Sequence, residues 1–337
     1  MTSRVRVVAV VLVAILLLGG ALAYVLVARQ TAAEQQSAAG SQPTTSLVAV
    51  ESGPRIVFRN SSLGSGLGRV AMVPVASPGG ARALTDLTCD RVFAAGGRTL
   101  CLASDPGVVT TYSATVYDDG TGNATQIPLT GSPSRARLSD DGTLAATTSF
   151  VAGDSYAQEG YSTRTVITEL DSSTSLDLET FTLVDGGKTI TPVDRNYWGV
   201  TFGPDDDRFF VTVGFGGTTH LAEGQISTKT IRTLRTDAEC PSLSPDGTRV
   251  AYKKNGNRAR GDWRLAVLDL ATGKETALAE DRSVDDQVEW LDDSRIMFGM
   301  PGEGSKAAET NVWVVAADGS GAPTLLIPNA WSPAVVR

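Results

Sequence analysis

The sequence predicts an all-β protein: a six-bladed β-propeller of four-stranded antiparallel blades, closed by the C-terminal strand and preceded by one N-terminal transmembrane helix. Three observations support this prediction. Residues 53–337 alternate polar and apolar residues in short stretches that turn signals separate, a pattern typical of β-strands. One turn motif recurs at intervals of about 40–50 residues, the length of a propeller blade. A charge-free apolar run near the N-terminus is long enough to span a bilayer.

Residues 1–30 contain this apolar run, from Val7 to Ala28, after Arg4 and Arg6. A spanning helix needs about 20 residues, and arginines before the run favour an N-terminus inside and the remainder outside. We therefore expect an uncleaved anchor in the cell membrane, with the propeller on the extracytoplasmic side. Ala21-Leu22-Ala23 also resembles a signal-peptidase site, so secretion after cleavage is the alternative.

Residues 31–52 are rich in Ala, Gln, Ser and Thr and have no sustained apolar period. We expect a flexible stalk between the anchor and the propeller. The whole chain has 337 residues, is 42% apolar and carries a net charge of -8. Such an acidic protein is a poor candidate for binding the nucleic acid backbone, so we expect no nucleic acid partner, and we expect a monomer.

The chain from residue 55 onward is repetitive. Five apolar residues precede the first turn of a unit: Phe93, Leu138, Phe202, Leu243 and Trp290. Their spacings are 45, 64, 41 and 47 residues. The long spacing indicates an insertion between Ser149 and Tyr197.

The two ends supply a sixth blade. Ile56–Arg59 resembles a second strand without a first strand before it, and Trp331–Val336 resembles a first strand with nothing after it. Val335 falls 45 residues after Trp290, in register with the series. We therefore expect the C-terminal segment to supply the innermost strand of the first blade, which closes the ring and leaves no open sheet edge between the first and last blades.

The clearest unit runs from Cys240 to Leu278 and is expected to form four short strands. Its turn, Ser244-Pro245-Asp246-Gly247, combines a proline that presets φ, an aspartate that accepts backbone hydrogen bonds and a glycine that takes a positive φ. This unit and Leu138–Ala145 resemble the repeat of the TolB-type β-propellers, and the whole arrangement resembles the membrane-anchored TolB-like proteins of actinobacteria. The resemblance covers about residues 55–337 and implies a propeller fold, because the motif marks a turn and not an active site.

The chain has three cysteines. Cys89 and Cys101 flank one predicted hairpin, and outside the cytoplasm a disulfide across that hairpin is chemically allowed. The alternative is a pair of buried thiols that pack as small apolar groups. Cys240 opens a strand, and we expect it to be unpaired, buried and inert.

Catalytic chemistry finds little support in the sequence. The only histidine is His220, and no Gly-x-Ser-x-Gly motif is present, which argues against a serine hydrolase because its nucleophile needs an adjacent base. Several acidic pairs, such as Asp140-Asp141, fall at the first turn of a unit, where turn chemistry explains them. We therefore predict no catalytic residue, no metal ligand and no cofactor. A calcium site or a glycosidase carboxylate pair stays open, because the sequence does not give distances.

Four-stranded blades place the loops between second and third strands on the same face as the connections between blades. We call this the loop-rich face, and the opposite one, which carries the Asp-Gly turns, the plain face. Aromatic, arginine and amide side chains gather on the predicted loops of the loop-rich face and suit recognition. The candidate binding residues are Tyr156, Tyr161, Arg195, Tyr197, Trp198, His220, Arg258, Arg260 and Asp285.

We expect these loops, at the mouth of the central channel, to bind an unknown envelope protein or peptide, or a glycan. The alternative is that the loops are simply solvated. A second class of function is an extracytoplasmic enzyme, a hydrolase or lyase that acts on glycans or phosphate esters. Catalysis would require carboxylates or cations that converge in the channel, whereas binding requires only a lined, aromatic mouth.

Overall fold

The computed structural model describes residues 12–13, 16–25, 27, 42–64, 66–151, 162–302 and 309–337. The chain divides into two compact units. The first comprises Met1–Gln42 and Ser62–Leu67, and the second comprises Pro43–Ser61 and Gly68–Arg337.

In the first unit, residues 12–13, 16–25 and 27 are helical, and apolar side chains such as Leu16 and Leu18 are exposed. No helix in the described part of the chain is both long and apolar enough to cross a bilayer. The predicted anchor, Val7 to Ala28, lies partly outside the described residues. The transmembrane helix therefore remains a prediction.

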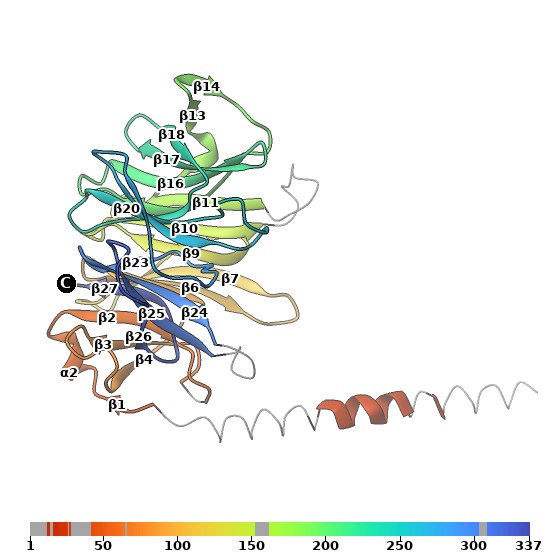
Figure 1. Ribbon diagram of the computed structural model, residues 1–337. Helices are drawn as coiled ribbons and strands as arrows, with labels where there is room; N and C mark the ends of the chain where they lie inside the picture. Colours follow the sequence, from red (N-terminus) through yellow and green to blue (C-terminus); the bar gives the residue numbers. More distant parts are fainter. Residues whose placement is uncertain are drawn as a thin grey trace, which may run out of the picture. The chain divides into compact units, whose positions relative to one another are not determined.

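The second unit is a six-bladed β-propeller, as predicted (Figure 1). In every blade the strands follow one another from the innermost outward. Blade 1 consists of β27 (Ala330–Val336), β2 (Arg55–Asn60), β3 (Arg69–Pro74) and β4 (Arg82–Thr88). Blade 2 consists of β5 (Arg91–Ala95), β6 (Arg98–Asp105), β7 (Thr111–Asp118) and β8 (Ala124–Ile127). Blade 3 consists of β9 (Ser132–Leu138), β10 (Leu144–Val151), β11 (Ser162–Glu169) and β12 (Thr174–Asp177).

The other three blades repeat this order. Blade 4 consists of β15 (Asn196–Phe202), β16 (Arg208–Phe215), β17 (Thr218–Gln225) and β18 (Thr230–Thr236). Blade 5 consists of β19 (Glu239–Leu243), β20 (Arg249–Lys254), β21 (Arg264–Asp269) and β22 (Glu275–Ala277). Blade 6 consists of β23 (Glu289–Asp292), β24 (Arg295–Pro301), β25 (Thr310–Ala316) and β26 (Thr324–Ile327). Consecutive strands pair antiparallel within each blade.

The C-terminal strand closes the ring, as the sequence predicts. β27 pairs antiparallel with β2, and Ile56 lies opposite Val335 (Figure 1). Ser332 in β27 donates a hydrogen bond to the carbonyl of Val92 in β5, at 3.0 Å, which joins blade 1 to blade 2. A short helix, α2 (Val48–Glu51), and the two-residue strand β1 (Thr44–Thr45), parallel to β4, complete this blade.

The long spacing before blade 4 has a structural counterpart. A single turn of 3-10 helix, η1 (Leu178–Thr180), is followed by the hairpin of β13 (Thr182–Asp185) and β14 (Lys188–Ile190). β13 pairs parallel with β18, so this segment widens blade 4 to six strands. The side chain of Leu178 is fully buried in the apolar core that blade 4 shares with blade 3.

The turns on the plain face follow the predicted chemistry. In blade 5 the Asp246 carboxylate accepts hydrogen bonds from the Ser244 hydroxyl at 2.5 Å and the Thr248 backbone N–H at 3.0 Å. Gly247 then takes a φ of 69°, which glycine adopts more readily than other residues. In blade 4 a non-glycine residue, Asp206, occupies the equivalent place with a φ of 53°.

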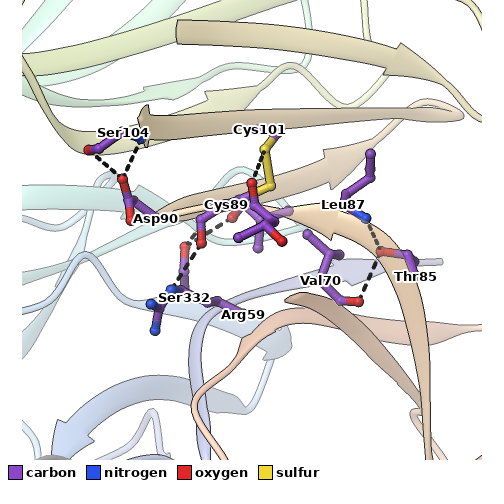
Figure 2. The surroundings of a disulfide bond; sticks show 11 residues. Arg59, Val70, Thr85, Leu87, Cys89, Asp90, Cys101, Ser104 and Ser332 are labelled. Carbon is purple, nitrogen blue, oxygen red and sulfur yellow. Dashed lines mark hydrogen bonds between the residues drawn. A yellow bond between two sulfur atoms is a disulfide. The ribbon is translucent and has the colours of Figure 1, made fainter. Parts of the chain in front are cut away.

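The structure confirms the predicted disulfide between Cys89 and Cys101, whose Cα atoms are 5.4 Å apart. Cys89 follows β4 of blade 1, and Cys101 lies in β6 of blade 2, so the bond fastens the connection between the two blades to the second blade (Figure 2). Arg59 in β2 donates to the carbonyl of Cys89 at 2.9 Å. The bond is buried, because Cys89 and Cys101 are 1% and 5% exposed.

Candidate functional site

The central channel is lined by the six innermost strands, β27, β5, β9, β15, β19 and β23. Innermost strands of a propeller are otherwise buried, so charged residues on them face the channel or must be paired. Such residues occur on four of the strands: Arg91, Arg135, Arg137, Glu239 and Glu289. The functional question is therefore how these charges are compensated.

The middle of the channel is filled by a buried ion pair. Arg137 in β9 donates to the carboxylate of Glu289 in β23, and to the carbonyl of Val288 at 3.3 Å. The guanidinium carbon of Arg137 also lies 4.4 Å from the ring centroid of Phe93. Burial raises the pKa of Glu289 even though Arg137 acts to lower it. The buried Nε atom of Arg137 has no partner in the described chain, but the carboxylate and the carbonyl engage the rest of its guanidinium, so the pair has a structural role.

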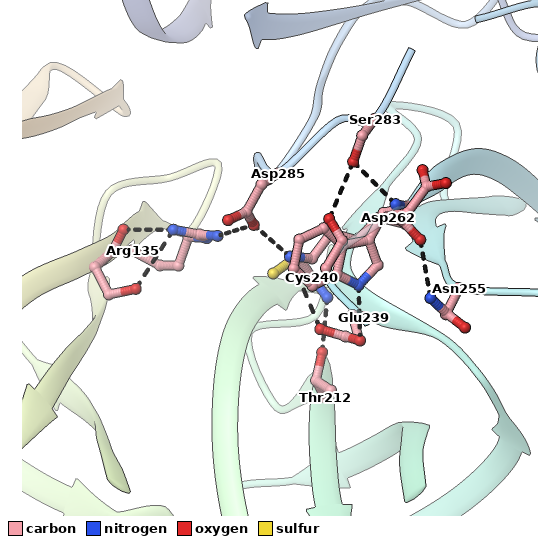
Figure 3. A network of polar contacts seen from close by, with 12 residues as sticks. Arg135, Thr212, Glu239, Cys240, Asn255, Asp262, Ser283 and Asp285 are labelled. Carbon is pink, nitrogen blue, oxygen red and sulfur yellow. Dashed lines mark hydrogen bonds and ion pairs between the residues drawn. The ribbon is translucent and has the colours of Figure 1, made fainter. Parts of the chain in front are cut away.

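The mouth on the loop-rich face holds a second group of charges, which we call the mouth cluster: Arg91, Arg135, Glu239, Lys253, Asp285 and Asp286. Figure 3 shows three of them, Arg135, Glu239 and Asp285. Lys253 lies 2.5 Å from the Asp285 carboxylate and 3.8 Å from that of Glu239. Its ammonium also lies 3.9 Å from the ring centroid of Trp263. The indole of Trp263 in turn donates to Glu239 at 3.0 Å. Lys253 is therefore held from three sides.

The two arginines of the mouth cluster are compensated much less well. Arg135 donates to the carbonyl of Ser134 at 3.0 Å and lies 3.6 Å from Asp285, but its buried Nε atom has no partner in the described part of the chain. Arg91 makes no hydrogen bond to any described residue; its guanidinium carbon lies 5.3 Å from the ring of Trp331. Burial, and then the neighbouring Arg135, lower the pKa of Arg91 to about 10.

The carboxylates of the mouth cluster differ in charge state. Burial acts to raise the pKa of Asp285, but Lys253, Arg135 and Arg91 together lower it below its ordinary value. Asp286 is only 4% exposed, and burial raises its pKa despite the same arginines. Its carboxylate accepts a hydrogen bond from the Gly299 backbone N–H at 2.9 Å. Burial thus disfavours the charged form of Asp286, which weakens its compensation of Arg91 and Arg135.

The channel below the mouth is too narrow for a substrate. A cavity of about 20 Å³ lies among Arg91, Arg135, Asp286 and Gln287. Gln287 donates across the channel to the carbonyls of Val200 and Pro241, at 3.0 and 2.9 Å. Such a cavity admits water at most, so a larger ligand could meet Arg91 and Arg135 only from the mouth.

Three of the predicted binding residues lie where the sequence suggests. Asp285 belongs to the mouth cluster. Arg258 and Arg260 are exposed in the loop between β20 and β21, on the loop-rich face. Tyr156 and Tyr161 lie outside the described residues.

The four candidates in and beside blade 4 are tied within that blade. Tyr197 is 1% exposed, and burial raises its pKa to about 12. The Trp198 ring packs against Gly214 of the next strand, so closely that a Cβ at Gly214 would lie 2.9 Å from it. Arg195 donates to the carbonyls of Pro192 and Glu179, at 3.0 and 3.2 Å.

His220 is the fourth candidate, expected in a loop or at the start of a strand, and it lies near the start of a strand. It is the third residue of β17 and is 8% exposed. Its ring stacks on Phe215, with centroids 4.3 Å apart, and its Nδ1 atom lies 3.3 Å from the carbonyl of Val213. The loop before it is only the two-glycine turn of a hairpin, Gly216-Gly217, so the histidine lies within the sheet.

Sequence reasoning missed Arg91, Arg135, Lys253 and Asp286. For Arg91 and Arg135 the available signal was the presence of charges on innermost strands, which a buried strand otherwise excludes. Lys253 lies in β20 and Asp286 in the connection before β23, so this signal does not reach them. Cys240 is unpaired and buried, as predicted. The described residues contain no group of three or more His, Cys, Asp or Glu side chains that could hold a metal ion.

Known proteins resemble the chain in fold. No model of a known protein family and no curated protein matches it. Among solved structures, TolB from Acinetobacter baumannii is 16% identical, with a TM-score of 0.57 over 85% of this chain and 67% of that chain. A chain of a nidogen/laminin complex is 12% identical, with a TM-score of 0.56 over 84% of this chain and 98% of that chain. A putative TolB from Agrobacterium tumefaciens is 12% identical, with a TM-score of 0.48 over 82% and 89%.

The likeness to TolB, together with the six blades, establishes a TolB-like β-propeller fold. At such identities it establishes nothing further, because one fold serves many functions. The function must therefore follow from the residues of the channel mouth.

Proposed function

We propose that the protein is a membrane-tethered, extracytoplasmic binding module, and that its channel mouth on the loop-rich face binds an acidic group of a protein or peptide partner. One observation carries this proposal: Arg91 is a half-buried arginine whose guanidinium makes no hydrogen bond to the described chain. An arginine offers five N–H donors in a planar fork that matches a carboxylate. A partner carboxylate at this place would accept the hydrogen bonds for which the described chain offers Arg91 no acceptor.

The surroundings of Arg91 support the same ligand class. Arg135 lies close enough to lower the pKa of Arg91, so an anion between the two would relieve their repulsion. The mouth is also lined by the rings of Trp331 and Trp263, and aromatic and arginine side chains are the usual anchors of protein interfaces. Arg258 and Arg260 add exposed positive charge on the adjacent loop.

Two observations support the tether and its compartment, and a third supports binding. The apolar run after Arg4 and Arg6 supports an N-terminal anchor with the remainder outside. A structural disulfide supports an oxidising compartment, since such bonds are rare in the cytosol. The similarity to a chain of a nidogen/laminin complex supports protein binding as a use of this fold.

The experiment places a photo-crosslinking residue in the full-length protein in cells, at position 258 on the loop-rich face or at position 318 on the plain face. We expect crosslinked partners at position 258 only, recovered with the membrane fraction. Adding Arg91→Gln should reduce that crosslink at least tenfold, because a charge-assisted pair is lost. The matched control is Arg232→Gln, an exposed arginine of β18.

Equal crosslinking from both faces, or a crosslink that Arg91→Gln leaves unchanged in a folded protein, would overturn the proposal. Arg91→Gln should fold normally, because the guanidinium makes no hydrogen bond in the described chain that the substitution would break.

The alternative, an enzyme that acts on glycans or phosphate esters, has one observation in its favour. Cations and carboxylates do converge in the channel, as catalysis would require. However, the cavity among them measures about 20 Å³, and that at the plain-face end about 50 Å³. Neither volume accommodates a sugar ring, so binding at the open mouth is the function that this geometry favours.

A further inference from the structure

A larger cavity lies between blades 2 and 3, near their outer strands. Its volume is about 220 Å³, and it is bordered by the connection after β8 and by β10, β11 and β12. Four hydroxyl side chains line it beside apolar ones: Thr130, Thr147, Ser149 and Ser175. The surface between two blades is normally apolar, as in the neighbouring cores, so hydroxyl groups on this wall can bond a polar occupant.

The register of blade 3 places these groups on one face of its sheet. Thr147 and Ser149 alternate along β10 and lie opposite Val166 and Arg164 of β11. Val166 in turn lies opposite Asp177 of β12. Because alternate residues of a strand share a face, the hydroxyls and the two charged side chains all line the same cavity.

The other wall is held in place by a close approach of the backbone. Gly131 has a φ of 88°, and a Cβ there would lie 2.1 Å from the carbonyl oxygen of Phe150. The connection after β8 can therefore lie directly against β10 only because residue 131 is glycine. The hydroxyl of Ser149 donates to the carbonyl of Thr130 across this contact, so the cavity is a built feature of the fold.

Several donors in this cavity lack partners. Thr147 is 3% exposed, and its hydroxyl makes no hydrogen bond to any described residue. Arg164 uses its Nε atom for Asp177, at 3.0 Å, and its two terminal nitrogens make no other hydrogen bond to the described chain. The Thr147 hydroxyl and the terminal nitrogens of Arg164 can therefore bond a polar molecule that enters the cavity.

We propose that this interblade cavity binds a single neutral sugar ring. Each sugar hydroxyl both donates and accepts, which matches a wall of hydroxyls beside the donor Arg164 and the acceptor Asp177. The apolar side chains of Pro128, Leu129 and Val166 also line the cavity and suit the C–H face of a pyranose.

Charge and size exclude the other simple ligands. A phosphate at Arg164 would face the Asp177 carboxylate 3.0 Å from that arginine, and a metal ion would find only one carboxylate. Pockets for drug-sized ligands measure about 300–1,000 Å³, so a cavity of about 220 Å³ suits one ring. Water alone would fill it with about seven molecules, at about 30 Å³ each.

The test uses the full-length protein and saturation-transfer NMR with D-glucose, D-galactose, D-mannose and N-acetyl-D-glucosamine at millimolar concentrations, and inorganic phosphate as the anionic probe. We expect saturation transfer to at least one sugar, and we expect added phosphate not to reduce that transfer. Thr147→Val should weaken the binding of that sugar about five-fold, because one neutral hydrogen bond is lost. The control, Thr115→Val in β7 of blade 2, removes a half-buried hydroxyl outside the cavity and should change nothing.

Thr147→Val should remain folded, because it removes a hydroxyl that has no partner in the described chain. A second variant, Arg164→Gln, changes a side chain that is 45% exposed. It should reduce the affinity for the same sugar more than Thr147→Val does. No transfer to any of the four sugars, displacement by phosphate, or unchanged binding in both variants would overturn the proposal. The channel-mouth variant Arg91→Gln should leave sugar binding intact. The proposal of partner binding at the mouth and the proposal of sugar binding in the interblade cavity are therefore tested independently.

Discussion

Single carboxylates in the plain-face turns have opposite effects on stability. Burial, and then the neighbouring Asp141 and Asp140, raise the pKa of Asp206 from its ordinary value of 3.8 to about 6. Burial also opposes ionisation of Asp246, but hydrogen bonds from Ser244 and Thr248 lower its pKa to about 2. One turn therefore prefers a neutral side chain, and the other prefers a carboxylate.

We expect Asp206→Asn to stabilise the protein at pH 7. The folded state favours protonated Asp206, so its contribution is present below pH 3.8 and is lost as the pH rises through about 6. Asparagine tolerates the positive φ and carries no charge, so the gain should be near zero at pH 4 and on the order of 1 kcal/mol at pH 7, after allowing for solvent screening.

Urea unfolding of both proteins between pH 4 and pH 8 measures this difference. Asp246→Asn is the control of opposite sign, because its carboxylate stabilises the fold above pH 3.8 and loses that effect as the pH falls through about 2. A constant offset between Asp206→Asn and the parent at every pH would contradict the explanation.

At the scale of elements, the disulfide stabilises the connection between blades 1 and 2. The two cysteines are 12 residues apart, and the loop model gives about 3 kcal/mol for closing a loop of that order. We expect the double variant Cys89→Ala/Cys101→Ala to melt roughly 6–9 °C lower, as the size of the propeller implies. Calorimetry with and without a reducing agent checks this, since the reductant should lower the melting temperature of the parent but not that of the double variant. A parent that is insensitive to the reductant would refute it.

The elements were predictable to different degrees. The four strands of Cys240–Leu278 and the β2–β27 pairing follow from local turn signals and from the regular spacing of the units, which are properties of the sequence itself. The mouth cluster was not predictable in this way, because Arg91, Arg135 and Lys253 come from three different blades. Their proximity depends on the geometry of the ring, and a buried charge acquires its meaning only from neighbours that are distant in sequence.

The sequence left His220 in a loop or at the start of a strand, and the turn before it decides between them. Gly216 and Gly217 form the whole turn of the β16–β17 hairpin. A two-residue turn leaves the next residues inside the strand. Whether a residue next to a predicted turn lies in the loop or in the strand is therefore hard to predict. Charges within a predicted innermost strand, in contrast, point to the channel.

At the scale of the whole molecule, the ring depends on one noncovalent closure. β27 is separated from its partner β2 by most of the chain, yet it provides the innermost strand of blade 1. Ala330 and Ala334 are fully buried there. Arg82 strengthens the closure by donating to the carbonyls of Pro328 and Asn329, at 2.7 and 3.0 Å, directly before β27. Without this strand, β2 would expose an unpaired edge to the channel.

Moving the closing strand tests this dependence on the ring. In fragment 53–337, deletion of residues 328–337 should abolish cooperative thermal unfolding, because the lost pairing and burial exceed the 5–15 kcal/mol by which a domain is typically stable. A circular permutant that begins at residue 328, joins residue 337 to residue 53 through two glycines and ends at residue 327 should unfold cooperatively, within about 5 °C of the parent fragment. The permutant keeps every strand pair and converts the β27–β2 contact into a local hairpin, since Arg55 lies opposite Val336. Circular dichroism melting of the three proteins decides the matter: a truncated fragment that melts like the parent would show that β27 does not close the ring.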